Sequence, residues 1–422
     1  MKNRDNTAKP LTRRDLFLKG ASRAAAVGAA LSIGSRAARA AGGGGIERAL
    51  VGIQLLGGAD SNNLLVPLDP AQYASYAQIR GPLALPREVL LPISATGGQA
   101  DFGLNPAAAE LYELYQLRAL ALVANVGSLM EPTTRDQCLA GSCELPSDLR
   151  EHIGNWMAYL PNGFFAPEWT VKAASPEYDQ ETRNLTAPTL SEGLGQAESS
   201  ANAFTFDTGL SLTTPDPISF PGGRHENPTL NEAAAPVFAS LANAFPQTYL
   251  GIQLQQAASL IWAAGEIGMR RLAFTSTLSG FDIHSEQPGR QDWLLGELSS
   301  AAAALYAVTS NWGIADRVTT YTDSEFNRTL QPNARGGTEH AWGGHQIAIG
   351  GSVLGGALYG RMPILSLGGP DDVDVTGIWA PTIARDQYYA TFAFWYSGSY
   401  STVAELFPRI HRFDRPTLDF LV

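Results

Sequence analysis

Near-continuous apolar runs alternate with longer amphipathic segments in the first part of the chain beyond the N-terminal 41 residues. Ala49–Leu56 and Leu120–Gly127 have the length and composition of strands that are buried on both faces. Between them, Asn105–Arg118 is predicted as a helix, because Pro106 suits its first turn and the leucines recur on one side. This order of strand, helix and strand predicts an α/β fold.

The same alternation returns after Tyr249. The predicted helices are Gly251–Ile267, Arg290–Asn311 and Thr382–Trp395. The predicted strands are Leu272–Thr277 and Arg317–Thr322, and the Gly-rich stretch from Ile347 to Ala357 is expected to form short strands and turns. The second half of the chain therefore adds further βα units to the sheet.

Residues 128–247 interrupt this pattern, because Pro, Thr, Ser, Asn and Gly dominate there and no periodicity persists. We expect a long insertion of loops and short elements within a single domain that spans residues 42–422. Loops of this length in a compact domain often cover an active site. His152 lies in the insertion, where a lone histidine is more often a surface or packing residue than a ligand.

Residues 1–41 are predicted to be a signal peptide. Thr12–Lys19 has the form of a twin-arginine export signal, an apolar run follows, and Ala38–Ala40 is the small-residue pattern that a signal peptidase cuts. A membrane anchor is the alternative, but Arg23 interrupts the apolar run, which is shorter than the ~20 residues of a span. We expect export by the twin-arginine translocase, a periplasmic or secreted protein, and no membrane span.

The charge of the chain excludes some partners. The sequence has 29 Lys and Arg against 40 Asp and Glu, and its formal net charge is −11. Removal of the signal peptide, with its nine basic and two acidic residues, leaves a net charge near −18. Such a surface repels nucleic acid and anionic lipid. An anionic substrate would need a local positive site, which a metal ion and an arginine could form together.

The only two cysteines, Cys138 and Cys143, are five positions apart in the segment CLAGSC. In an oxidising compartment they are expected to form a small loop disulfide. Two unpaired loop thiols are the alternative.

Carboxylates and imidazoles follow two successive predicted strands. Asp282 and His284 come after the first, and Tyr321–Gln346 comes after the second, with Glu325, Arg328, Glu339, His340 and His345 among glycines. The carboxyl ends of such strands meet at one edge of a sheet. Imidazole and carboxylate are the usual ligands of zinc and related ions. Asp60, just beyond the first strand, is a further candidate.

Each of these residues also has a structural interpretation. Asp60 would cap a turn after two glycines. Asp282 and His284 would hydrogen-bond the backbone, Glu325 would pair with Arg328, and His345 would be a satisfied core histidine.

The segments that hold these residues match a known family pattern: Gly57–Pro67, Gly280–Gln287, Ser324–Leu330, Gly337–Gln346 and Gly350–Gly360. The sequence resembles the domain of unknown function 1501 family, whose members are exported bacterial proteins of the alkaline phosphatase-like superfamily. The resemblance implies a three-layer α/β sandwich with a mostly parallel central sheet, alkaline phosphatase-like. It also implies a site for one or two divalent metals at the strand ends, zinc first, with manganese and calcium as alternatives.

By the same resemblance, Arg328 is expected to be a catalytic group that stabilises an oxyanion or supports the ligands, since its planar fork suits a tetrahedral anion. The implied metal ligands are Asp60, Asp282, His284, Glu325, Glu339, His340 and His345. We therefore expect a metal-dependent hydrolase that acts on phosphate or sulfate esters.

The alternative is a catalytically silent member that serves as a binding or assembly factor for an envelope polymer. Two departures from the family pattern favour it. Glu325 and Glu339 stand where the pattern usually has aspartate. The serine of a Ser-His pair that many relatives carry after Pro132 is absent, and the nearest match here is Glu151–His152.

Overall fold

The computed structural model of the protein describes residues 45–94, 102–146, 149–150, 152, 203–205 and 228–422. The predicted signal peptide and most of the predicted insertion lie outside these ranges. The described chain has an α/β fold built on one central sheet. Its strands are β1 (Arg48–Leu56), β5 (Leu120–Gly127), β6 (Ala203–Thr205), β7 (Arg271–Ser279), β8 (Val318–Ser324), β9 (Gly344–Gly350), β10 (Ala357–Tyr359) and β11 (Ile383–Ala384).

The central sheet is mixed, which corrects the prediction of a mostly parallel sheet. The strand order is β10-β5-β9-β8-β1-β7-β6, with β11 also paired to β5. β1, β7 and β8 run parallel to one another, whereas β9 runs antiparallel to both β8 and β5. The reason lies in the connection. Parallel neighbours need a crossover, usually a helix, but the chain from β8 to β9 is a loop that turns back at the same edge.

A second, small antiparallel sheet was not predicted. It has the order β2-β4-β3 and consists of β2 (Leu65–Pro67), β3 (Leu91–Ile93) and β4 (Phe102–Leu104). Strands of three residues are too short to show a periodicity in the sequence. Helix α2 (Pro70–Arg80), which begins at a proline after the capping side chain of Asp69, also escaped prediction.

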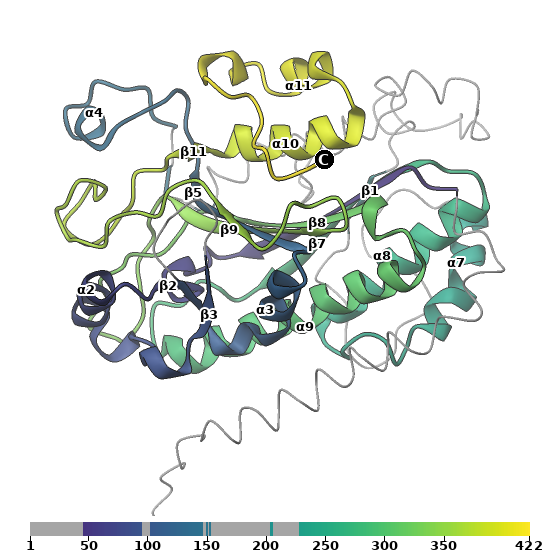
Figure 1. Ribbon diagram of the computed structural model, residues 1–422, viewed down its shortest axis with the longest axis horizontal. Coiled ribbons are helices and arrows are strands. Elements are labelled where there is room, and N and C mark those ends of the chain that lie inside the picture. The colour runs from purple at the N-terminus through teal and green to yellow at the C-terminus, as the bar shows by residue number, and fades with distance from the viewer. Residues whose placement is uncertain (1–44, 95–101, 147–148, 151, 153–202, 206–227) are drawn as a thin grey trace, which may run out of the picture.

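Helices cover both faces of the central sheet (Figure 1), so the described chain has three layers. On one face lie α3 (Ala109–Gln116), α8 (Tyr249–Glu266) and α9 (Gln287–Asn311), and on the other lie α10 (Arg385–Ser397) and α11 (Tyr400–Leu406). Two further helices are α4 (Arg135–Leu139) and α7 (Pro228–Ser240), which packs beside α8. In the described part of the chain, no helix is both long and apolar enough to cross a bilayer.

Alternation along the strands divides the core between the two helical layers. In β5, Leu120, Leu122 and Ala124 face the α9 layer, whereas Ala121 and Val123 face the α10 layer. All five are buried, which explains why β5 is apolar from Leu120 to Ala124. The predicted strands and helices of the two halves are confirmed with small shifts at their ends.

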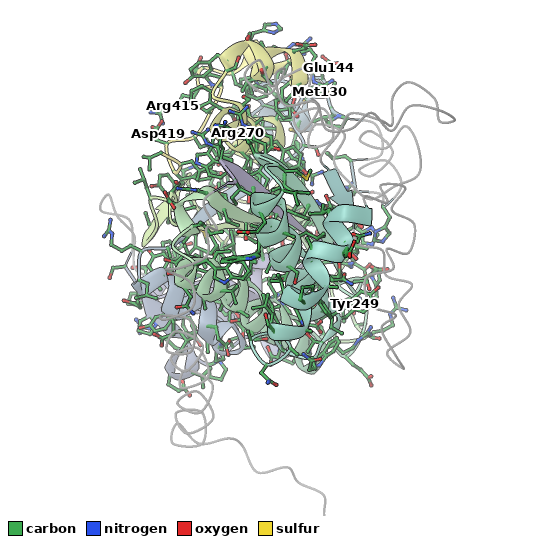
Figure 2. The ribbon with its side chains drawn as sticks, turned by 90° about the vertical axis from the view of Figure 1, so that its right-hand side faces the viewer. Met130, Glu144, Tyr249, Arg270, Arg415 and Asp419 are labelled. Carbon is green, nitrogen blue, oxygen red and sulfur yellow. The ribbon has the colours of Figure 1, made fainter. Side chains whose placement is uncertain are left out.

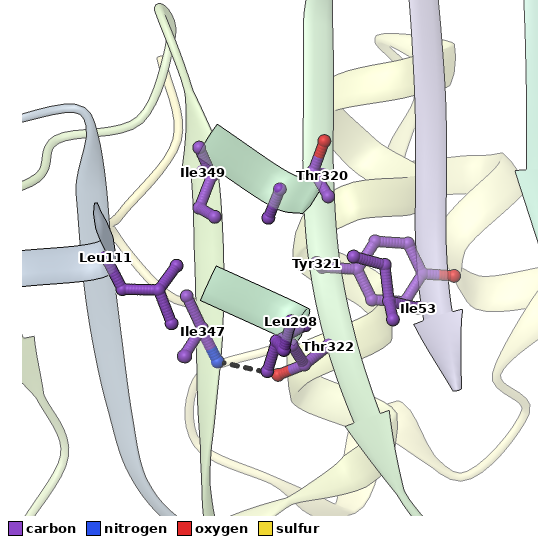
Figure 3. Close-up of a pocket in the computed structure, with 9 residues that line it drawn as sticks. Ile53, Leu111, Leu298, Thr320, Tyr321, Thr322, Ile347 and Ile349 are labelled. Carbon is purple, nitrogen blue, oxygen red and sulfur yellow. Dashed lines mark hydrogen bonds between the residues drawn. The ribbon is translucent and has the colours of Figure 1, made fainter. Parts of the chain in front are cut away.

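One small space lies between the central sheet and the helices α3 and α9. Leu111 of α3 and Leu298 of α9 meet Ile347 and Ile349 of β9 around a narrow space (Figure 3). Its one drawn hydrogen bond runs from the backbone N–H of Ile347 to Thr322 Oγ1, at 3.0 Å. The space does not admit a water-sized molecule, so it belongs to the core rather than to a site.

The α4 segment is tied to the C-terminal part of the chain. Arg412 donates to the carbonyl of Met130 at 3.3 Å and to Glu144 Oε2 at 2.9 Å, and both residues lie near the C-terminal helices (Figure 2). Within this segment, Cys138 and Cys143 are free thiols whose Sγ atoms are 3.9 Å apart. The predicted disulfide is therefore not formed, and the alternative of two thiols holds.

Replacement of Phe392 tests the α10 layer of the core. Its ring is fully buried and stacks on Tyr321 with centroids 4.5 Å apart. We expect Phe392→Ala to lower the free energy of unfolding by about 3–5 kcal/mol, measured by denaturant titration with circular dichroism. Trp293→Ala is the control, because that side chain is 64% exposed and should change the value by less than about 1 kcal/mol. Equal losses would contradict this description of the core.

Candidate metal centre

The predicted site segments meet at one edge of the central sheet. β1, β7 and β8 end side by side, because Leu56 pairs with Ser279 and Leu55 with Ser324. The segments that follow these strands contain Gly57–Asn63, Gly280–Glu286 and the loop 325–343. This is the edge at which α/β proteins place their sites, and the prediction that both polar clusters share it is confirmed.

Two glycines allow these segments to approach closely. Gly57 and Gly58 have φ angles of 107° and 77°, a region that L side chains rarely adopt. A Cβ on Gly58 would lie 2.2 Å from the ring of Phe326, and one on Gly57 would lie 2.4 Å from the backbone nitrogen of Asp282. The Gly57-Gly58 pair is therefore required by the packing of the site.

The loop 325–343 folds back on itself. The backbone N–H of Thr329 donates to the carbonyl of Glu339 at 2.9 Å, and that of Ala341 to Asn327 at 2.8 Å. Arg328 and His340 are opposite each other in this short antiparallel pairing. The loop thereby turns His340 toward the segment after β7, which is itself held by the bond from the Thr338 N–H to Ile283 O at 3.2 Å.

Three imidazole nitrogens converge on the carboxylate of Asp282. Nε2 of His284 is 2.9 Å and Nε2 of His340 is 3.3 Å from Oδ1, and Nε2 of His152 is 3.6 Å from Oδ2. In the set of His152, Asp282 and His340, one possible ligand atom from each residue lies within 4.8 Å of the others. We call these three residues the central triplet.

Both histidines of the central triplet are oriented through their second ring nitrogen. His152 Nδ1 is 2.5 Å from Glu325 Oε2, and the other oxygen of Glu325 accepts from the N–H of Gly57 at 3.1 Å. His340 Nδ1 donates to the carbonyl of Arg150 at 2.8 Å. With Nδ1 held in this way, Nε2 of each ring faces the carboxylate of Asp282, where both nitrogens could bind one metal together with it. This is the arrangement usual for ligating histidines.

His284 has a second carboxylate neighbour. Its Nδ1 lies 2.8 Å from Glu339 Oε2, and Asn333 donates to Glu339 Oε1 at 2.6 Å. The hydrogen bond from Asn333, with the charges of His284 and Arg335, lowers the pKa of Glu339 against the effect of burial. The predicted ligands His284 and Glu339 thus lie beside the central triplet, with His284 next to the Asp282 Oδ1 atom that His340 also approaches.

Asp282 is held in its charged form. Burial raises its pKa, but the hydrogen bond and charge of Arg328, with His284 and His340, outweigh burial and lower the pKa to about 2. Burial is also the largest effect on His340 and lowers its pKa. At neutral pH the central triplet therefore offers a carboxylate and a neutral imidazole, as metal binding requires.

Arg328, the predicted catalytic group, is buried, and its guanidinium nitrogens donate hydrogen bonds within the protein. Its Nε donates to Gly58 O at 2.8 Å, Nη1 donates to Thr338 O at 3.1 Å, and Nη2 donates to Gly57 O and, at 2.5 Å, to Asp282. The side chain is 1% exposed. These contacts favour a structural role over the predicted contact with an oxyanion.

Asp60, a predicted ligand, is engaged elsewhere. Its carboxylate pairs with the fully buried Arg80, accepts from Gln287 Nε2 at 2.5 Å and accepts from the N–H of Asn62 at 3.0 Å. This places Asp60 at the start of the short 3₁₀ helix Ser61–Asn63, as the turn-capping interpretation predicts.

His345, also a predicted ligand, lies in β9 below the site. Its Nδ1 accepts from the N–H of Asn125 at 3.1 Å, where β5 bulges against β9. Burial lowers the pKa of His345 to about 4. The structure therefore gives His345 the character of a neutral core histidine.

Sequence reasoning missed His152 as a candidate ligand. Composition and periodicity carry no signal for it, because its segment has no regular pattern. The one available signal was its position, at the histidine of the Ser-His pair that the family pattern places after Pro132.

The fold and the cluster define an α/β protein with histidines and carboxylates gathered at the ends of parallel strands. A family described as "Protein of unknown function (DUF1501)" matches residues 244–378, a segment that holds β7, β8, β9 and most of the cluster. This match, over less than half of the chain, supports the predicted resemblance to that family. No curated protein matches the chain.

His345 should make stability depend on pH. Its pKa is about 4 in the folded protein and about 6.5 in the unfolded chain, which therefore binds more protons between these values. Stability is thus lost as the pH falls from about 6.5 to about 4, by roughly 3 kcal/mol. We expect His345→Gln to reduce that loss in urea titrations at several pH values, whereas His411→Gln, at an exposed histidine, should not. An unchanged pH profile in His345→Gln would contradict the buried, neutral state.

Proposed function

We propose that the protein binds a divalent metal at the central triplet and is an exported metal-dependent hydrolase of phosphate or sulfate esters. The observation that carries this proposal is the convergence of His152, Asp282 and His340 within 4.8 Å, with both imidazoles oriented through their far nitrogens. Carboxylates that gather at a surface without a metal do not usually have neighbouring histidine rings fixed through Nδ1 in this way.

The donor set fits the proposed metal. Two imidazole nitrogens and one carboxylate oxygen form the set that catalytic zinc sites use, with one position left for water or substrate. Manganese and calcium are the alternatives, although calcium prefers a shell made of oxygens. Bound there, the metal would supply Lewis acidity for an ester oxygen and lower the pKa of water.

The chain's own residues would prepare the site. Asp282 stays ionised because Arg328 donates to it, and Glu325 and the Arg150 carbonyl hold the two rings. Metal and Arg328 together offset the carboxylates of this edge, so an anionic ester could approach a chain whose net charge is −11.

A second candidate function, a silent binding or assembly factor for an envelope polymer, is favoured because the hydroxyl groups of Ser61, Thr133 and Thr134 are all hydrogen-bonded within the protein. Ser61 Oγ donates to Asn327 Oδ1 at 3.0 Å and accepts from the N–H of His345 at 2.9 Å. Thr133 Oγ1 donates to Glu131 O at 2.9 Å, and Thr134 caps α4. Since these hydroxyl groups are hydrogen-bonded within the protein, hydrolysis would depend on water as the nucleophile.

Export remains part of the proposal. It is supported by the twin-arginine pattern at Thr12–Lys19 and the cleavage pattern at Ala38–Ala40. A metalloprotein that folds before export would suit this route, and a periplasmic or secreted location follows from it.

Metal content tests the proposed centre. We expect the mature protein, exported from its host, to carry about one equivalent of a divalent metal by elemental mass spectrometry, and an Asp282→Ala/His340→Ala variant to carry none. The control variant, Asp419→Ala/His411→Ala, removes the same residue types at exposed positions and should keep the metal. Wild-type protein that contains no metal and takes up none would eliminate the proposed centre.

A panel of phosphate monoesters, phosphate diesters and sulfate esters separates the two candidate functions. We expect the metal-loaded protein to turn over at least one class, and the Asp282→Ala/His340→Ala variant to lose that activity because it loses the metal. Metal binding without turnover on any ester would leave the binding or assembly factor as the remaining function.

A further inference from the structure

Helix α10 reaches the edge of the sheet that holds the site. Arg385 is its first residue and is only 4% exposed. Its Nη2 donates to the carbonyls of Ser324 and Glu325, both at 2.6 Å. The guanidinium therefore contacts the backbone at the point where β8 ends and the site loop begins.

The contact with Arg385 takes the place of the strand pairing that β8 lacks at its end. β8 pairs with β9 only over Thr319–Tyr321, and its last pair with β1 is at Ser324. Beyond that point the strand carbonyls need another donor, because an unpaired buried carbonyl is costly. The Nη2 group of Arg385 has two N–H donors, so this one nitrogen can serve both neighbouring carbonyls at once.

Arg385 is itself held in place by a buried carboxylate. Its Nε is 3.6 Å from Asp323 Oδ1, and the hydroxyl of Tyr389 donates to Asp323 Oδ2 at 2.5 Å. All three side chains are buried. Asp323 lies on β8 and the other two residues on α10, so the group joins the helix to the strand.

Glu325 connects Arg385 to the central triplet, because it contacts both Arg385 and His152. Its backbone is fixed by Arg385 and its carboxylate by the N–H of Gly57, and the same carboxylate is 2.5 Å from His152 Nδ1. A small shift of the Glu325 backbone would move the oxygen that orients the His152 ring. Ring orientation decides whether Nε2 points at a metal.

We propose that Arg385 is a positioning residue for the metal centre, which acts through Glu325 on His152. It binds neither metal nor substrate, and it works from the helical layer behind the sheet. This inference rests on the proposed metal centre and adds to it a residue far from the cluster in sequence.

The test uses cobalt(II) as the probe, since its visible absorption reports ligand geometry and chelator competition gives its affinity. We expect Arg385→Met to weaken cobalt binding about 10-fold to 100-fold and to alter the spectrum. Arg385→Lys, which keeps the charge and one donor nitrogen, should restore part of both the affinity and the spectrum. Arg361→Met is the matched control, because Arg361 forms a two-point ion pair with Asp371 outside the cluster and should leave both unchanged.

A double-mutant cycle tests the route through Glu325. If Arg385 acts through that carboxylate, the effect of Arg385→Met on cobalt affinity should shrink in a Glu325→Gln background. Fully additive effects would overturn the route. Folded Arg385→Met protein with wild-type affinity and spectrum would overturn the whole inference while leaving the metal centre intact.

Two further outcomes are decisive. If Arg385→Met does not fold, Arg385→Gln, which removes the charge, takes its place in the cycle, and wild-type cobalt binding by that variant overturns the inference. If the wild-type protein binds no cobalt, zinc or manganese, the metal centre fails, and the positioning role fails with it.

Discussion

The guanidinium of Arg328 joins the segments on which the site is built. It is buried under the edge of the sheet and donates to the carbonyls of Gly57 and Gly58 after β1, to Thr338 in the site loop and to Asp282 after β7. Loss of one partner of such a buried charge is expensive, since the others remain without compensation. The position of Asp282 and of the segments around it therefore depends on this side chain. Gly57 and Gly58 allow the segments that follow the strands to come close enough to share it.

The site is supported from two directions. From below, Arg328 fixes Asp282 and keeps it charged, and the folded-back loop 325–343 carries His340 and Glu339 to it. From the opposite layer, α10 fixes the point at which β8 passes into that loop. Functional side chains held in this way, by rigid elements and by outer hydrogen bonds, keep their geometry to the tolerance that a metal centre needs.

Much of this arrangement is predictable because it depends on local pattern. The buried strands β1 and β5 are almost entirely apolar, and β7 and β8 combine apolar residues with buried Thr and Ser, so the existence and the type of these strands follow from the sequence. The gathering of Asp282, His284, Glu339 and His340 at one edge follows from their position after successive parallel strands. The direction of β9 does not follow from the sequence, because it depends on whether the chain after β8 crosses the sheet or turns back at the same edge. The Gly-rich sequence of this connection is compatible with both. The role of His152 was equally hidden, since its place depends on contacts with Glu325, 173 residues away.

The sequence by itself determined which residue types are available and which segments are buried: the α/β class, the strand ends and the stock of carboxylates and imidazoles. Only the tertiary structure decided which of these carboxylates and imidazoles join the cluster and which are hydrogen-bonded elsewhere. Asp60 and His345 have the right chemistry for ligands, but Arg80 and the backbone of Asn125 engage them, and His152 takes a place at the cluster instead. The physical reason is that a side chain's chemistry is local, whereas the partner that satisfies or frees it comes from a distant part of the chain.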